Sequence, residues 1–222
     1  MKLKLFFIIF LLLSSPAEAE NIVVSSLEWL TDTSSAVGIY TVNTCKIKEV
    51  GCYVCPYECS VILLRTLKNI PPEERTIIYY NYTFDINDIG SGDQILVFFS
   101  EDDHGEKQVI HQINLDKPQK RGDQFIAVTS EFELLTEKDK ILGIVETRLK
   151  EFPNQKVLKY GEWPKVEDRF EIEIPIDNPV YTPVNSGSGC YLVVPEDLKE
   201  KAKQKAKELE DIKIFDLRNI GK

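Results

Sequence analysis

Short runs of apolar residues recur between Ala36 and Thr129, separated by turn residues, and Ala36–Val42 also alternates with the period of two that is typical of β-strands. β-Branched and aromatic residues dominate these runs, which strengthens the expectation of strands. The expected strands are Ala36–Val42, Ser60–Leu67, Thr76–Phe84, Gln94–Ser100, Gln108–Leu115 and Phe125–Thr129. Two more follow later, at Phe170–Ile176 and Cys190–Val194, and Pro175 restricts the former to an edge strand or a strand end.

Helical patterns are fewer. Ser25 to Glu28 has the form of a capping box, in which Ser25 bonds to the Glu28 amide and a helix follows over Ser26–Asp32. Thr136 is the expected cap of a helix that ends near Phe152, with an apolar stripe at Ile141, Val145, Leu149 and Phe152. Pro195 suits the first turn of a last helix that ends near Leu209.

This order of elements predicts a mainly β (α+β) fold, a small β-barrel or sandwich with one internal helix and a C-terminal helix. The internal helix would close or plug the barrel. We expect a β-rich barrel domain over residues 20–176, with a cysteine-rich hairpin over 45–59. Residues 177–222 would add a loop, a short strand and the last helix.

The amino terminus has the pattern of a cleavable signal peptide over residues 1–19. Lys2 and Lys4 precede an apolar run from Leu5 to Leu13, and Ala17-Glu18-Ala19 has the small-x-small form of a cleavage site. The run is shorter than the roughly 20 residues that a membrane-spanning helix needs. The sequence therefore predicts a secreted or periplasmic protein that begins near Glu20 and keeps no stable membrane span.

The charge of the chain bears on its partners. A net charge of -9 and a pI near 4.9 disfavour binding to nucleic acid, because an acidic surface repels the phosphate backbone. No sequence motif indicates a cofactor. The expected partner is an unknown protein or small molecule.

Five cysteines are present, and four of them lie close together. Cys45, Cys52, Cys55 and Cys59 form this cluster, and export favours their oxidation to disulfides. Four cysteines allow three pairings, of which Cys45 with Cys59 is the most plausible, because these two flank the strands and could face each other. Cys52 and Cys55 would then pair at the hairpin tip or stay free. Cys190 is the candidate for the odd thiol.

Two other interpretations of the cysteine cluster remain open. Four thiolates could ligate zinc, although the spacing departs from that of paired knuckles. Cys52 and Cys55 could instead form a redox centre, but a reactive thiolate is favoured by a helix amino terminus or a cationic neighbour, and Pro56 follows directly.

Within residues 25–130 the order is Leu27-Glu28-Trp29-Leu30, then Val37 to Val42, Leu64 to Lys68 and Gly92 to Phe98. This pattern resembles the OB-fold barrels of exported netrin-like and metalloproteinase-inhibitor-like proteins, and the resemblance implies an OB-like β-barrel. The resemblance implies a short helix, a first strand, a long hairpin and a Gly-Asp turn before a later strand. Such inhibitors chelate a protease zinc through an amino-terminal cysteine. Glu20 stands near the expected terminus here, so the resemblance does not imply that activity.

Few residues indicate catalysis. His104 and His111 flank a predicted turn that also carries Asp102 and Asp103, which leaves a metal site conceivable, although exposed histidines beside a turn are commonly plain loop residues. No nucleophile-elbow sequence is present. Asn81 begins a glycosylation sequon, which has meaning only in a eukaryotic host.

The leading functional hypothesis is a non-enzymatic extracytoplasmic binding or interaction module, since barrel faces and long hairpin loops commonly bind partners. A thiol-disulfide oxidoreductase that uses Cys52 and Cys55 is the alternative. A hydrolase with an unrecognised site is the third possibility.

Overall fold

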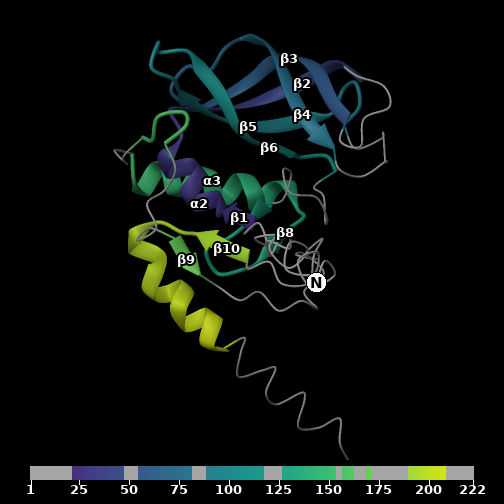
Figure 1. Ribbon diagram of the computed structural model, residues 1–222. Helices are drawn as coiled ribbons and strands as arrows, with labels where there is room; N and C mark the ends of the chain where they lie inside the picture. Colours follow the sequence, from purple (N-terminus) through teal and green to yellow (C-terminus); the bar gives the residue numbers. More distant parts are fainter. Residues whose placement is uncertain are drawn as a thin grey trace, which may run out of the picture.

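A computed structural model describes residues 22–47, 55–81, 89–117, 127–153, 157–162, 169–171 and 190–208 (Figure 1). The predicted signal peptide lies outside these residues. The strands are β1 (Ile22–Ser25), β2 (Ala36–Ile47), β3 (Cys55–Lys68), β4 (Glu74–Asn81), β5 (Gln94–Glu101), β6 (Lys107–Asn114), β7 (Ala127–Val128), β8 (Leu134–Leu135), β9 (Arg169–Glu171) and β10 (Cys190–Val193). The helices are α2 (Leu27–Thr33), α3 (Lys138–Glu151), the short 3-10 helix η2 (Glu196–Leu198) and a C-terminal helix over 199–208.

The main element is a five-stranded antiparallel sheet with the strand order β4-β3-β2-β5-β6. It confirms the prediction of a mainly β fold, and β5 and β6 lie close to their predicted bounds. β2 and β3 are longer than predicted, because their ladder continues past Val42 and Ser60 into the cysteine segment. β7 is shorter than the predicted strand Phe125–Thr129, and Phe125 and Ile126 lie outside the described residues.

The molecule is built in layers (Figure 1). α2 and α3 lie against one face of the five-stranded sheet. Beyond them, on the side away from the sheet, lies a small sheet of order β1-β10-β9, followed by the C-terminal helix. β1 pairs parallel to β10, so the first and last described strands are neighbours. α3 is therefore placed between the sheet on one side and the C-terminal layer on the other.

Each face of the five-stranded sheet has its own hydrophobic core. Alternate residues of β2 and β5 point to opposite faces, as the pleat requires. The helix-covered face contains Val37, Ile39, Leu96, Phe98 and Ile113, packed against Leu27, Leu30, Ile141 and Val145 of α2 and α3. The other face contains Tyr40, Val42, Cys59, Val61, Ile77, Val97 and Phe99.

β4 and β6, the edge strands of the five-stranded sheet, approach each other around the second core, which is the core on the face that the helices do not cover. The guanidinium of Arg75 on β4 donates a hydrogen bond to the carbonyl of Lys107 on β6 and lies 5.3 Å from the centre of the Phe99 ring. No backbone ladder joins β4 to β6 among the described residues. The sheet is thus curved enough for one side chain to bridge its edges, while a closed barrel is not formed by the described strands.

The predicted pairing of Cys45 with Cys59 is confirmed. The two residues lie directly opposite each other in the β2–β3 ladder, with Cα atoms 4.1 Å apart, and form a disulfide. Cys59 is buried in the second core and Cys45 packs against it. The disulfide therefore lies within the hairpin ladder, where it stabilises the sheet, and the tip of the hairpin lies beyond it.

Two predicted helix caps are wrong by one residue. The N-cap of α2 is Ser26, whose side chain accepts a hydrogen bond from the Trp29 amide, so the capping box predicted at Ser25 does not form. α3 has Glu137 at its N-cap in place of Thr136, with no side-chain bond there. Leu27 and Ile141, near the starts of the two helices, pack into the same core.

Candidate functional site

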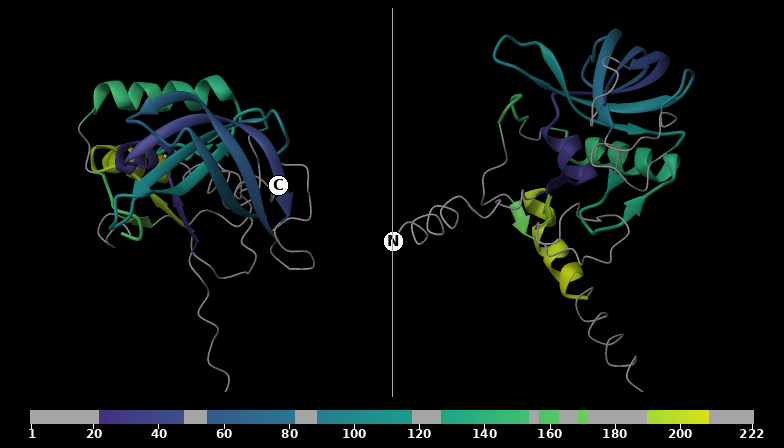
Figure 2. Two further views of the ribbon diagram at one scale, coloured as in Figure 1. Left: turned by 90° about the horizontal axis from the view of Figure 1, so that it is seen from above. Right: turned by 45° about the vertical axis from the view of Figure 1, so that its right-hand side comes forward.

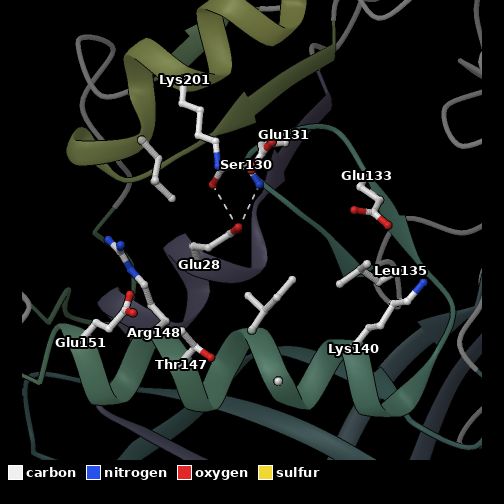
Figure 3. Close-up of a pocket in the computed structure, with 13 residues that line it drawn as sticks. Glu28, Ser130, Glu131, Glu133, Leu135, Lys140, Thr147, Arg148, Glu151 and Lys201 are labelled. Atoms are coloured by element: carbon white, nitrogen blue, oxygen red, sulfur yellow. Dashed lines mark hydrogen bonds and ion pairs between the residues drawn. The ribbon is translucent and has the colours of Figure 1, made fainter.

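A pocket of about 610 Å³ lies between α3, the β7–β8 turn and the C-terminal helix (Figure 3). This volume is in the range of small-molecule sites. Its lining residues are Glu28, Ser130, Glu131, Glu133, Leu135, Lys140, Gly143, Ile144, Thr147, Arg148, Glu151, Leu198 and Lys201. The pocket is therefore formed where α3 faces the C-terminal layer.

The outer face of α3 forms one wall. Lys140, Gly143, Thr147 and Glu151 recur at helical spacing, while Ile141 and Val145 face the opposite way into the sheet core. A Cβ atom added at Gly143 would meet no atom within 4 Å. Gly143 thus opens space along the wall, although a glycine inside a helix costs about 0.5–1 kcal/mol relative to alanine.

Glu28 lies in the middle of the pocket and is held by Ser130 (Figure 3). The Ser130 amide and hydroxyl both donate to Oε2 of Glu28, at 3.0 and 3.1 Å. The Ser130 hydroxyl is also 3.0 Å from the hydroxyl of Ser26. The second oxygen of Glu28, Oε1, accepts no hydrogen bond from another described residue.

The turn that carries Ser130 has a fixed shape. The Thr129 hydroxyl accepts from the amides of Glu131 and Glu133, and Phe132 adopts a left-handed backbone with φ of 67°. The Thr129 amide also donates a hydrogen bond to the Glu133 carbonyl, and the Thr129 carbonyl accepts one from the Phe132 amide. These bonds orient the Ser130 amide toward Glu28, which joins the β7–β8 turn to α2.

Arg148 borders the pocket and joins three elements. Its guanidinium makes a paired contact with Asp32 on α2, at 2.8 and 2.6 Å, and a second with Asp197 on η2, at 2.8 and 2.7 Å. It also lies 3.9 Å from the centre of the Phe152 ring. The side chains of Arg148 and Asp32 are 6% and 7% exposed, whereas that of Asp197 is 41% exposed. Two carboxylates therefore saturate the guanidinium, which keeps little capacity for a ligand.

Burial changes the acidity of several of these groups. It raises the pKa of Glu28 above its ordinary value of 4.5, although the bonds from Ser130 and the charge of Arg148 act in the opposite direction. Burial likewise raises the pKa of Asp32, against the bonds from Arg148. The pKa of Asp197 is lowered, chiefly by its bonds to Arg148. Burial lowers the pKa of Lys68, which donates to the carbonyls of Thr31 and Asp32 at the end of α2.

The C-terminal helix supplies the opposite wall. Lys201 forms an ion pair of 2.5 Å with Glu131 on the β7–β8 turn, and Leu198 lines the pocket beside it. Ala202 is buried against Val128, Leu192 and Val194. The C-terminal helix and the η2 turn before it are thus attached to the rest of the fold by the apolar contact of Ala202 and by the ion pairs of Lys201 and Asp197.

This arrangement is suited to holding a ligand. Ser130 shares its hydroxyl with Ser26 and Glu28, and neither histidine lines the pocket, so the constellation lacks the imidazole base of a serine hydrolase. Among the described residues, no group of three or more His, Cys, Asp or Glu side chains could hold a metal ion. The carboxylate of Glu28 is thus held in place between apolar and charged walls.

The remaining predicted site residues that the structure describes do not line this pocket. Cys52 lies outside the described residues, and Cys55 begins β3, so its backbone is in a strand and not at a helix amino terminus. Cys190 begins β10, where it pairs with Ile22. His104 lies in the β5–β6 turn and His111 lies in β6 beside Phe98. Asp102 caps that turn by accepting from three donors.

Sequence reasoning missed the residues that form the pocket. Glu28 was assigned to a capping box, yet its carboxylate binds Ser130, which is remote in sequence. Arg148 did carry a signal, because it falls at helical spacing within the apolar stripe of Ile141 and Val145. A charged residue in such a stripe indicates a buried ion pair or a functional site. No comparable signal marked Ser130.

The chain was also compared with known proteins. No protein-family model matches it, and no curated protein matches it significantly. Within the part of the chain that the structure describes, no helix has the length and apolar character needed to cross a membrane.

Proposed function

We propose that the protein is an exported, non-enzymatic binding module whose ligand site is the pocket between α3 and the C-terminal layer. One observation carries the proposal: the outer face of α3 is left open at Gly143, opposite a carboxylate that Ser130 fixes in place. A helix surface that served only to close the fold would be better filled by a larger side chain. Gly143 is exposed on this wall, and its missing side chain leaves room for a ligand beside Glu28.

Export is part of the same proposal. It is supported by the signal-peptide pattern of residues 1–19 and by the disulfide between Cys45 and Cys59, since disulfides persist in oxidising compartments. Mass spectrometry of secreted protein is expected to show a chain that starts at or near Glu20. Recovery of mature protein with an intact Met1 terminus would contradict cleavage.

An OB-like barrel and a netrin-like relationship also remain proposals. The OB-fold is a five-stranded, partly open barrel. The curved five-stranded sheet and the Arg75 bridge between its edges support this interpretation. Barrel closure between β4 and β6 in an experimental structure would strengthen it, and a flat open sheet would contradict it.

The binding function can be tested by filling the pocket. Gly143→Trp places a large side chain in open space on the exposed face of α3, so the fold should tolerate it, while Gly143→Ala is the matched control. A chemically diverse fragment library is screened by ligand-observed NMR against wild type and both variants. Fragments that bind wild type and Gly143→Ala but not Gly143→Trp are expected. A library with no fragment that distinguishes Trp from Ala would overturn the proposal.

A further inference from the structure

We propose that the pocket binds an elongated organic cation in which ammonium groups are carried on a flexible alkyl chain. This inference rests on the proposed function, because it names the ligand of the same pocket. It is drawn from the charge, length and apolar lining of the site.

The charges of the lining are not balanced. The cations are already engaged: Lys201 pairs with Glu131, Lys140 pairs with Glu137 at 2.8 Å, and Arg148 is held by Asp32 and Asp197. Three lining carboxylates remain, Glu28, Glu133 and Glu151, and none of them forms an ion pair with a described residue. The lining has four carboxylates against three cations, and this excess of one negative charge favours a cationic ligand. Lys140 acts on Glu133, and Arg148 and Lys201 act on Glu28, so a ligand ammonium group would share these carboxylates with them.

The unpaired carboxylates are spread along the pocket. Figure 3 shows Glu151 at one end of the α3 wall, Glu133 at the other and Glu28 between them. Lys140 and Glu151 mark the two ends of the α3 wall, and at 1.5 Å per residue they lie about 16 Å apart along the helix. A ligand that contacts all three carboxylates must therefore be long and carry separated charges.

Apolar side chains separate the carboxylates. Ile144, Leu135 and Leu198 line the same pocket, and Gly143 adds open space between them. Alkyl segments suit such surfaces, because their burial contributes about 25 cal/mol per Å². Oε1 of Glu28, which accepts no hydrogen bond from another described residue, can accept one from an ammonium group. The pattern matches amines that are spaced by methylene groups.

This chemistry has two natural sources: a free linear polyamine, or lysine side chains of a peptide. Spermidine and a trilysine peptide represent them as probes. Glutarate and pentanediol serve as anionic and neutral comparisons of similar chain form. The probe that binds more tightly identifies the source.

The test is isothermal titration calorimetry on the full exported chain. Glu133→Gln combined with Glu151→Gln removes the two outer carboxylates, and Glu28→Gln removes the central one. Glu73→Gln combined with Glu106→Gln removes two exposed carboxylates outside the pocket and controls for general charge. We expect spermidine or trilysine affinity to fall about tenfold or more in the pocket double variant. Glu28→Gln should weaken binding as well, and the control should stay close to wild type.

Other outcomes separate the two proposals. Equal weakening in the control and pocket variants would show attraction to the acidic surface alone and would overturn the assignment of the cation to this pocket. Glutarate or pentanediol binding that Gly143→Trp blocks would overturn the cationic ligand but support the binding module. Tight spermidine or trilysine binding that Gly143→Trp abolishes and Gly143→Ala preserves would support both.

Discussion

The two faces of α3 serve opposite purposes. The face toward the five-stranded sheet buries Ile141 and Val145 completely, in one continuous core with α2. The face toward the C-terminal layer carries Lys140, Gly143, Thr147 and Glu151 and borders a pocket of about 610 Å³. The same helix thus closes one interface tightly and leaves the other open.

The contrast shows how one helix can carry a tightly packed face and an open face. The interface between α3 and the sheet is stabilised by burial of apolar side chains, an interaction that has no preferred direction. The outer interface is held by polar links at Arg148, Lys201 and Glu28, which fix positions while enclosing space. Substitutions of buried side chains, on the sheet face or at Arg148, should therefore cost stability, and substitutions of exposed side chains on the outer face should mainly change binding.

Arg148 lies at the boundary of the two interfaces, and its loss should have the largest effect. Arg148→Met leaves the Asp32 carboxylate buried without its partner, which is expected to lower the free energy of unfolding by about 3–5 kcal/mol. Urea unfolding followed by circular dichroism measures the change. Asp197→Asn, on the exposed side of the same guanidinium, should cost about 1 kcal/mol or less.

A double variant tests the reason. Arg148→Met combined with Asp32→Asn removes both charges and should recover part of the loss, because the buried carboxylate is then absent. Equal costs for Arg148→Met and Asp197→Asn would show that burial of Asp32 does not determine the effect.

The sheet face of α3 should be the next most sensitive region. Ile141→Ala is expected to destabilise the protein by about 2–5 kcal/mol, because the fully buried side chain leaves a cavity in the core. Thr147→Ala, on the outer face of the same helix, is the matched control and should change stability by about 0.5 kcal/mol or less. Thermal and urea unfolding give both values, and similar losses for the two variants would refute the contrast between the faces.

The smallest effect concerns the acidity of Glu28. Its pKa in the folded protein is raised, chiefly by burial, so the folded state favours the protonated carboxyl. The resulting contribution to stability is fully present below the ordinary pKa of 4.5 and is lost as the pH rises through the folded pKa. Glu28→Gln, which keeps an acceptor for Ser130 but does not titrate, should therefore gain stability relative to wild type as the pH rises.

The free energy of unfolding of wild type and of Glu28→Gln is measured by urea unfolding from about pH 4 to about pH 8, and the difference between the two proteins is followed as a function of pH. Arg148 and Lys201 are the charged groups that act on Glu28, and both remain cationic throughout this range. If this difference in the free energy of unfolding stays constant with pH, the pKa of Glu28 is the same in the folded and unfolded states, and the prediction is wrong.

The residue pattern predicted much of the five-stranded sheet, because its strands are runs of apolar, β-branched and aromatic residues bounded by turn residues. β5 and β6 match their predicted bounds closely, and the Cys45–Cys59 pair followed from the positions of the strands that they flank. The extension of β2 and β3 was missed, since Lys46 and Glu58 are polar and pair across an exposed part of the ladder. In this part of the β2–β3 ladder the backbone pairing continues, but the residues show no apolar pattern from which it could be predicted.

The pocket could not be predicted in the same way. Its residues come from α2, the β7–β8 turn, α3 and the C-terminal helix, and the contact between Glu28 and Ser130 spans a long stretch of sequence. Local propensity contains no information on such contacts. Moreover, β1 is only four residues long, and its pairing with β10 depends on a partner that appears much later in the chain.

The parallel pairing of β1 with β10 has a consequence for the order of folding. A contact between the first and last described strands closes a very long loop. Closing this loop costs conformational entropy, and the contact stabilises the fold only after that cost has been offset. The antiparallel hairpins of β2, β3, β5 and β6 form from near neighbours and can form first. During synthesis the sheet can thus fold while the C-terminal layer is still emerging. The pocket is completed only after β10 has paired, because Leu198 and Lys201, which form one of its walls, follow β10 directly.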